Sequence, residues 1–369
     1  MYDAGRPLTL SGAKLEARPA VLRQMISRLG KSTPAQPSPL DQELRQIEDE
    51  GRRRALLLVG SYREATIAAD LLEEVPRWRG RVRVLAADDA ELDYAGSVGR
   101  VGNDGFAHAT AVRRGDLAAF AEDPDAELLV APMLAIERGH NILNAGRTAA
   151  FGVVFFLARP HPRPDDLNLA VFAINDWATR FIRDRPGLET GTFSKLVAEA
   201  GHLDAAGLAF RHLARREWRR LLSRRYSYSR LSAAEQTSFA WDQLVTIWQV
   251  IGRLVRGGVP AKVIFVDAAF APALAEASAP SLDSTHEASR PRRRRADEGL
   301  LAKLRDILAP YFDSAADPES FENPADPALV QTLYQPLYDA LCGLRTTASS
   351  LAQEPPIIED KERPHVPHV

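Results

Sequence analysis

Five short apolar runs constrain the fold of this 369-residue chain more than any other feature of its sequence. They are rich in valine, isoleucine and leucine, and they lie at residues 55–62, 81–87, 127–133, 152–158 and 262–268. The first, ALLLVGSY, is apolar without alternation, as expected of a strand that is buried on both faces of a parallel sheet. Helical spacing follows it at 63–75. Strands that alternate with helices predict an α/β fold with a mostly parallel sheet flanked by helices.

The rest of the chain divides by composition. Residues 167–248 have helical spacing and no strand pattern, which predicts a helical insertion into the α/β domain. Helical spacing returns at 299–312 and 328–345, which predicts a C-terminal helical appendage. The predicted organisation is an N-terminal extension or interlobe linker at 1–50, an α/β domain at 51–275, a basic linker at 276–298, the appendage at 299–346 and a disordered tail at 347–369.

Composition excludes several classes of protein. Cys342 is the only cysteine, so the chain cannot form an internal disulfide framework, a cysteine-ligated zinc site or an iron–sulfur cluster. The tail histidines, His365 and His368, are too few to indicate a metal site, and none is predicted. No apolar run approaches the ~20 residues of a membrane span, and the N-terminus lacks a secretory pattern. We therefore expect a cytoplasmic protein without membrane contact.

The stretch QVIGRLVRGG, at residues 249–258, places two arginines in an otherwise apolar run, where arginine is costly without a partner. Four of its residues form the pattern QxxGRxxR: Gln249, Gly252, Arg253 and Arg256. This pattern resembles motif VI of superfamily 2 helicases, and the strand-like KVIFVDAAF that follows resembles the XPD/DinG-like branch. The resemblance implies that Arg253 and Arg256 reach the γ-phosphate of ATP, and that Gln249 and Gly252 adjoin the nucleotide. The alternative is a helix end whose arginines face solvent or cap carbonyl groups.

Two further segments resemble helicase motifs in the order of that family. LLVAPMLAIERGHNI, at 128–142, resembles motif V, whose residues are here Glu137, Gly139 and Asn141. They would link the state of the nucleotide to the grip on the nucleic acid, although Asn141 replaces the usual aspartate and lacks its charge. The alternative is a plain turn after a strand. The segment LLLVGSYREA, at 56–65, resembles motif IV, which implies that its Ser61 and Tyr62 contact nucleic acid.

The chain lacks the motifs that hold ATP in such enzymes. LGKST, at 29–33, has no glycine-rich loop before it and follows a helical stretch, so we do not interpret it as a P-loop. SGA, at 11–13, resembles motif III, which links the two RecA-like lobes of these helicases. The resemblance therefore implies the second lobe, with ATP and Mg²⁺ held by a missing first lobe, on another chain or lost. We expect this chain to be inactive alone.

An arginine-rich helical segment completes the candidate sites. Residues 210–230 carry arginines at helical spacing, interleaved with Trp218, Tyr226 and Tyr228. The arginines most suited to phosphate contacts are Arg215, Arg216, Arg219 and Arg220. DNA is favoured over RNA as the partner, and a solvated helix is the alternative. The predicted function is the C-terminal lobe of an ATP-dependent helicase; the alternatives are a non-catalytic nucleic-acid-binding module and an unrelated α/β protein.

Overall fold

The computed structural model of the protein describes residues 1–3, 5–87, 109–136, 141–160, 168–182, 193–223, 233–278, 299–317, 321 and 323–350. The chain divides into two compact units. The sheet unit comprises Met1–Pro160 and Phe239–Val369, and the helical unit comprises His161–Ser238. The helical unit thus falls mostly within the helical insertion predicted at 167–248.

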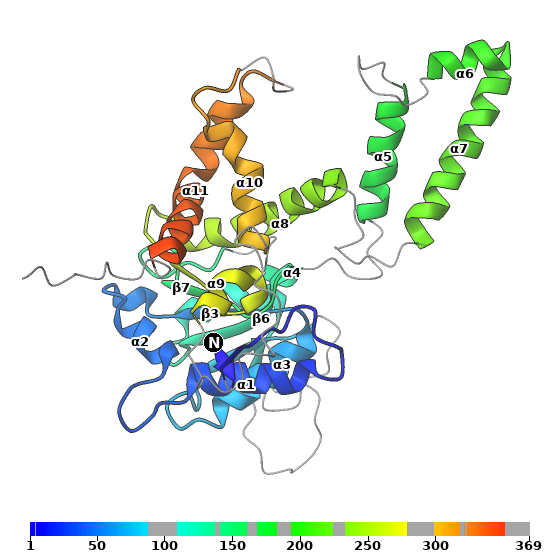
Figure 1. The fold of residues 1–369 in the computed structure, drawn as a ribbon. Helices are drawn as coiled ribbons and strands as arrows, with labels where there is room; N and C mark the ends of the chain where they lie inside the picture. The colour runs from blue at the N-terminus through cyan, green and yellow to red at the C-terminus, as the bar shows by residue number, and fades with distance from the viewer. Residues whose placement is uncertain are drawn as a thin grey trace, which may run out of the picture. The chain divides into compact units, whose positions relative to one another are not determined.

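The sheet unit is built on six strands, which are all parallel (Figure 1). In spatial order they are β5 (Thr110–Val112), β4 (Val82–Leu85), β6 (Leu128–Pro132), β3 (Ala55–Val59), β7 (Val153–Phe156) and β8 (Lys262–Phe265). The five apolar runs of the sequence therefore form five of the six strands, as predicted. β5 was missed, because its three residues are too few for a pattern.

Helices cover both faces of this sheet. Leu57 and Val59 of β3 pack in one core with α1 (Arg18–Gly30), α2 (Pro39–Arg45) and α3 (Tyr62–Glu73). Leu56 and Leu58 point to the opposite core, because neighbouring side chains of a strand face opposite sides. The helices of that second core are α8 (Ala233–Leu254), α10 (Leu300–Phe312) and α11 (Asp326–Ser350). The result is an α/β fold of three layers, consistent with the RecA-like fold (Figure 1).

The C-terminal helices belong to the core of the sheet unit. Leu304 and Leu308 of α10, with Leu337 and Leu341 of α11, are buried in the same cluster as the central strand. The rings of Phe312 and Tyr338 stack between the two helices at 4.1 Å. The segment predicted as an appendage therefore shares one hydrophobic cluster with one face of the sheet and with α8.

Short elements complete the sheet unit. β1 (Tyr2–Asp3) and β2 (Arg6–Pro7) form a small antiparallel pair. The remaining elements are the 3-10 helices η1 (Glu50–Arg52), η2 (Arg114–Glu122) and η4 (Ala268–Phe270), and the α-helices α4 (Met133–Ile136) and α9 (Pro272–Ala277).

The helical unit contains α5 (Asn168–Ile182), α6 (Phe193–Ala200) and α7 (Leu203–Ser223). Aromatic rings hold them together: Phe210 of α7 lies 5.7 Å from Trp177 and 5.4 Å from Phe181, both on α5. Phe193 of α6 meets the same ring edge-on at 5.9 Å. Among the described helices of the whole chain, none is long and apolar enough to cross a membrane.

Candidate functional site

The predicted site residues of the sheet unit lie at two opposite edges of the sheet. A parallel sheet has an amino edge, where all its strands begin, and a carboxyl edge, where they end. Helix α8 runs back to the amino edge, ends at Leu254 and leads through a turn into β8. Arg253 and Arg256 therefore lie at the amino edge, whereas Ser61 and Tyr62 follow β3 at the carboxyl edge.

At the amino edge, three motif VI residues, Gln249, Gly252 and Arg253, lie in the last turns of α8, and Arg256 lies in the turn that follows the helix. The spacing of three and four positions from Gln249 to Gly252 and Arg253 places these three residues on neighbouring turns of one helical face. Gln249 and Arg256 are exposed, and Gly252 and Arg253 are half-buried. The opposite side of the helix is buried through Val250, Ile251 and Leu254. Among the described residues, the side chain of Arg256 has no hydrogen bond or ion pair, so it is available to a ligand.

A glycine turn joins Arg256 to the loop before β7. Gly257 and Gly258 have φ values of 83° and 73°, a conformation that favours glycine. A Cβ atom at Gly257 would lie 3.1 Å from the Cα atom of Thr148, so the two backbones are in close contact. The backbone N–H of Ala149 donates to the carbonyl oxygen of Arg256 at 3.0 Å. The loop that follows the motif V segment is thus fixed against the arginine pair.

Of the motif V residues, Asn141 lies in this part of the chain and is exposed. Ile142, beside it, accepts a hydrogen bond from the backbone N–H of Ala150 at 3.0 Å, which brings the start of the loop next to its end. Glu137 and Gly139 lie outside the described residues.

Arg52 connects its own segment, before β3, to the segment before β7 and to the end of α8. Its side chain donates to the carbonyl oxygens of Ala149 at 2.9 Å, Phe151 at 3.1 Å and Leu254 at 3.1 Å. The residue is only 4% exposed. Burial lowers the pKa of the Arg52 guanidinium, and the charge of Asp49 partly offsets this. Arg52 therefore holds the end of α8 and the start of β7 at a fixed spacing from β3.

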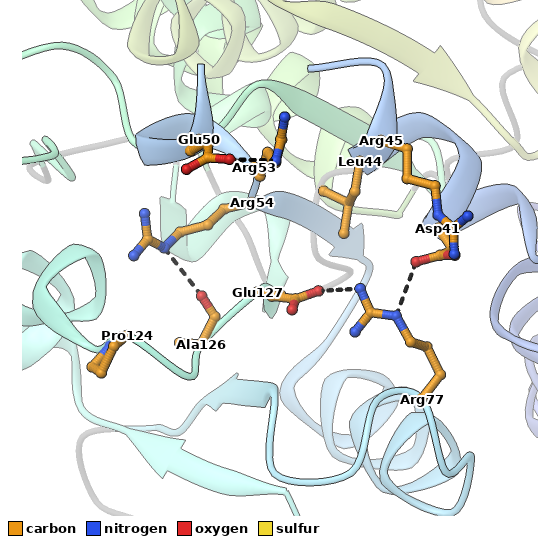
Figure 2. Close-up of a pocket in the computed structure, with 10 residues that line it drawn as sticks. All are labelled: Asp41, Leu44, Arg45, Glu50, Arg53, Arg54, Arg77, Pro124, Ala126 and Glu127. Carbon is orange, nitrogen blue, oxygen red and sulfur yellow. Dashed lines mark hydrogen bonds and ion pairs between the residues drawn. The ribbon is translucent and has the colours of Figure 1, made fainter. Parts of the chain in front are cut away.

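A hollow of about 520 Å³ also opens at the amino edge (Figure 2). Four arginines and three carboxylates line it: Arg45, Arg53, Arg54, Arg77, Asp41, Glu50 and Glu127. Arg53 pairs with Glu50 at 3.0 Å and Arg45 pairs with Asp41 at 2.6 Å. Arg54 donates to the carbonyl oxygens of Ala126, Gly51 and Ala121, and burial lowers its pKa.

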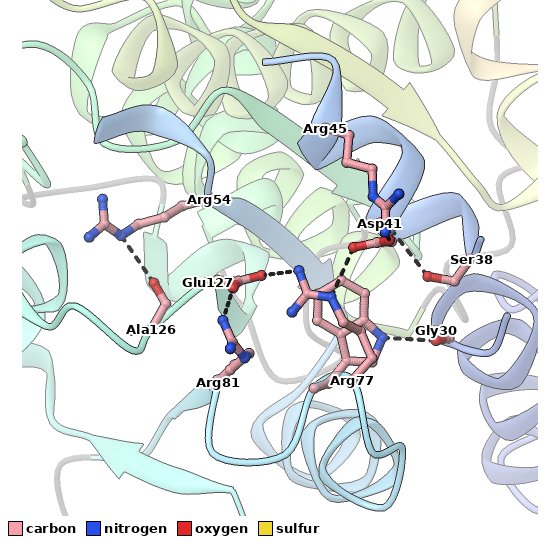
Figure 3. A network of polar contacts seen from close by, with 10 residues as sticks. Gly30, Ser38, Asp41, Arg45, Arg54, Arg77, Arg81, Ala126 and Glu127 are labelled. Carbon is pink, nitrogen blue, oxygen red and sulfur yellow. Dashed lines mark hydrogen bonds and ion pairs between the residues drawn. The ribbon is translucent and has the colours of Figure 1, made fainter. Parts of the chain in front are cut away.

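Arg77 is the centre of this network (Figure 3). Its guanidinium donates to Asp41 at 2.9 Å and to Glu127 at 2.7 Å, and it lies 4.3 Å from the centre of the Trp78 ring. Burial alone would lower the pKa of Arg77, but the hydrogen bonds to Glu127 and Asp41 raise it overall. All the charged side chains that line the hollow have partners within the chain. The network therefore stabilises the starts of the strands, and we assign no ligand to it.

At the carboxyl edge, the predicted nucleic-acid residues make contacts within the chain. The side chain of Ser61 accepts from the backbone N–H of Glu64 at 3.2 Å and thereby caps the start of α3. Tyr62 is half-buried against the core that contains Leu58. The structure does not bring these two residues together with Arg253 and Arg256, because the length of the sheet separates the two edges.

The segment that resembles motif III closes over the carboxyl edge. The backbone N–H of Ser11 donates to Asp267, after β8, at 2.7 Å, and its hydroxyl accepts from the backbone N–H of Arg159, after β7, at 2.8 Å. Arg18 pairs with Glu64 at 2.7 Å, and Glu64 also accepts from the backbone N–H of Gly60 at 2.9 Å. Residues 8–18 therefore connect the ends of three strands.

The LGKST sequence has the opposite context to a P-loop. Gly30 is the last residue of α1 and Lys31 follows it, exposed, so the LGKST sequence comes after a helix and not between a strand and a helix. The carbonyl oxygen of Gly30 accepts from the Trp78 indole at 2.8 Å. Phosphate loops present the start of a helix, whose dipole attracts anions, whereas the end of a helix repels them.

In the helical unit, the predicted nucleic-acid residues form an exposed basic face on α7. Arg211, Arg215, Arg216 and Arg219 are exposed, and no acidic partner is found for them among the described residues. Arg220 pairs with Glu217. Trp218 is half-buried, and Tyr226 and Tyr228 lie outside the described residues.

Comparison with family models, with curated proteins and with solved structures gave no match to this chain. Its function is therefore argued from its own residues. Within the described part of the chain, no three histidine, cysteine, aspartate or glutamate side chains are grouped in a way that could hold a metal ion.

Two residues of the amino edge, Arg52 and Arg147, were not among the predicted site residues. Arg52 stands in the run RRR at 52–54, and nothing in the sequence separates it from its neighbours. Arg147 is exposed on the loop fixed against Arg256, and its φ value is 59°. Its signal in the sequence is the dipeptide Gly146-Arg147, which precedes a strand but does not by itself indicate a ligand.

Proposed function

We propose that this chain is the second RecA-like lobe of a superfamily 2 helicase, which adds arginine side chains to an ATP molecule held with Mg²⁺ by a separate first lobe. The observation that carries the proposal is the face of Gln249, Gly252, Arg253 and Arg256 at the amino edge of a parallel sheet. Arg256 is exposed there, beside a turn that is fixed to the rest of the unit.

The chemistry of this face suits a phosphate chain. A guanidinium group presents a planar fork of donors that matches two phosphate oxygens, and it stabilises the negative charge that develops in phosphoryl transfer. Gly252 adds a further indication, because a Cβ atom there would meet nothing within 4 Å. Glycine inside a helix costs about 0.5–1 kcal/mol relative to alanine. Packing within the described chain does not explain why glycine occupies this position. A ligand that lies close to the helix backbone at Gly252 would explain it.

The side chains present indicate which roles this chain would have and which roles the first lobe would have. The arginines would bind and orient the terminal phosphate, and Asn141, on the loop bonded to Arg256, would respond to their position. The described residues include no phosphate-cradling loop, since Gly30 and Lys31 end a helix. The groups that hold Mg²⁺ and activate water would then come from the first lobe.

The test is an ATPase assay with and without a candidate first lobe, such as a neighbouring gene product with a P-loop and an acidic box. We expect no DNA-stimulated ATP hydrolysis by the chain alone and a clear rate when the two are mixed. Steady hydrolysis by this chain alone would refute the need for a first lobe. Activity of the candidate lobe that is unchanged by adding this chain would count against the proposed role.

A second candidate function, nucleic-acid binding by the helical unit, is favoured by the exposed arginines of α7. Arg211, Arg215, Arg216 and Arg219 repeat at helical spacing, so their charges lie close together on the helix. Such a surface gains affinity for a polyanion by releasing counterions from phosphates. This function is compatible with the first, and it would remain if the chain has no partner lobe.

Replacing Arg215 and Arg219 together with glutamine should weaken DNA binding and make it less sensitive to salt. Each lost phosphate contact lowers the slope of log affinity against log salt by about 0.7–0.9, so the pair should lower it by about 1.5. Fluorescence anisotropy of labelled DNA at several salt concentrations measures this slope. The matched control replaces Arg23 and Arg79, which are equally exposed but lie in the sheet unit. Equal effects of the two double variants would show that only net charge matters.

A further inference from the structure

Arg147 has an unusual backbone conformation for its type. Within the described ranges it is the one residue other than glycine with a positive φ, at 59°. A side chain in this left-handed region costs about 1–2 kcal/mol, because its Cβ atom crowds the carbonyl oxygen. Such outliers persist where the surrounding structure enforces them, and they are more frequent at functional sites.

The turn that contains Arg147 is firmly held by Asn144. The backbone N–H of Arg147 donates to the Asn144 carbonyl oxygen at 2.9 Å. The side-chain oxygen of Asn144 accepts from both the backbone N–H and the hydroxyl of Thr148, at 3.1 Å and 3.0 Å. A tight turn followed by a left-handed residue is a common arrangement in which that residue is usually glycine. Here the glycine, Gly146, comes one position earlier, and an arginine occupies the strained position.

The position of this turn connects Arg147 to the arginines of α8. Thr148 is in contact with Gly257, and the N–H of Ala149 donates to Arg256. Arg52 holds Ala149 and Leu254 together from below, so the two segments keep a fixed spacing. Arg147 is exposed, and its side chain has no hydrogen bond or ion pair among the described residues. Two exposed arginines, Arg147 and Arg256, therefore stand on adjoining, rigidly joined segments.

We propose that Arg147 and Arg256 together bind the phosphate chain of a nucleoside triphosphate. This inference rests on the proposed function, and it adds a residue that the motif pattern does not contain. Two guanidinium groups on adjoining segments can each donate to the oxygens of one polyphosphate, and each such charge-assisted hydrogen bond favours binding. The free energy spent on the left-handed backbone of Arg147 would then keep its side chain in the binding position before the ligand arrives.

The test measures binding of inorganic tripolyphosphate to the full chain by calorimetry. Arg256→Gln and Arg147→Asn should each weaken binding about five- to tenfold, as expected for the loss of a charge-assisted contact. Asparagine tolerates the left-handed region, so the turn should survive. Arg147→Lys should retain part of the affinity. Arg23→Gln, which removes an exposed charge elsewhere, should leave binding unchanged.

A second readout separates ligand binding from a role in folding. Arg147→Gly should raise the melting temperature, because glycine removes the strain, and should weaken tripolyphosphate binding. A lower melting temperature for Arg147→Gly would assign the arginine to the turn itself and overturn the inference. Absence of tripolyphosphate binding to the unaltered chain at millimolar concentrations would overturn it as well.

The outcomes also distinguish this inference from the proposed function. Loss of binding in Arg256→Gln but not in Arg147→Asn would overturn the role of Arg147 and leave the role of Arg256 intact. Binding that depends on neither arginine would contradict both. Binding that Arg23→Gln weakens equally would show a general charge effect and overturn the site.

Discussion

On the proposed function, replacing Arg256 with alanine should lower the ATPase rate of the chain mixed with a candidate first lobe by about 10³-fold or more, the range found for arginine fingers. The loss should appear in kcat more than in KM, because the guanidinium acts mainly on charge that develops during phosphoryl transfer. The melting temperature should not change, since the Arg256 side chain is exposed and forms no hydrogen bond or ion pair with the described residues. The measurement is steady-state ATP hydrolysis at saturating DNA.

Two variants control for this prediction. Arg256→Lys keeps the charge without the planar fork, so it should recover little of the rate. Val255→Ala changes the neighbouring exposed residue of the same turn and should leave the rate within about twofold, as is usual for surface changes away from a site. A rate for Arg256→Ala within a few-fold of the unaltered mixture would remove Arg256 from the site, even if the two lobes act together.

Replacing Arg52 with methionine should destabilise the sheet unit by about 3–5 kcal/mol. The buried carbonyl oxygens of Ala149, Phe151 and Leu254 would each lose a donor, at a cost of about 1–3 kcal/mol apiece before the structure relaxes. The methionine would return only part of this through its apolar side chain. Because the chain has two units, amide hydrogen exchange in β3, β6 and β7 is the measurement that reports on the sheet unit.

The matched control is the next residue along the chain. Arg53→Met removes an exposed ion pair with Glu50 and a hydrogen bond to the Ile47 carbonyl oxygen, and it should cost about 1 kcal/mol or less. Arg52→Lys should remain nearly as harmful as Arg52→Met, since one ammonium group on a flexible stem cannot reach three carbonyl oxygens in fixed directions. Equal exchange rates for Arg52→Met and Arg53→Met would show that the three hydrogen bonds contribute little.

The sequence was sufficient for the α/β fold because its strands are buried on both faces. An uninterrupted apolar run such as ALLLV is typical of a strand that is buried on both faces of a parallel sheet. β3 has this sequence and lies in the middle of the sheet. The two-residue strands β1 and β2 and the three-residue strand β5 carry no such pattern. The inclusion of α10 and α11 in the hydrophobic cluster at one face of the sheet was not predicted either, since a helical pattern does not identify the residues that cover its apolar side.

The candidate site could be predicted only where its residues lie close together in sequence. Gln249 to Arg256 form a pattern because the end of one helix and the turn directly after it carry them all. Arg52 forms a hydrogen bond with Leu254, which is 202 positions away in the sequence. Ser11 forms a hydrogen bond with Asp267, which is 256 positions away. Arg147 is distinguished by a backbone angle, which composition and spacing do not reveal.

The pairing of β7 with β8 has a consequence for synthesis of the protein on the ribosome. Val153 pairs with Lys262, and the whole helical unit lies between them in the sequence. A growing chain that has passed Phe156 therefore carries a buried-type strand, VVFF, whose outer edge has no neighbour until the last strand is made. An unpaired apolar edge readily joins other chains. The speed with which the ribosome completes residues 161–265 thus sets how long each nascent molecule is exposed to aggregation.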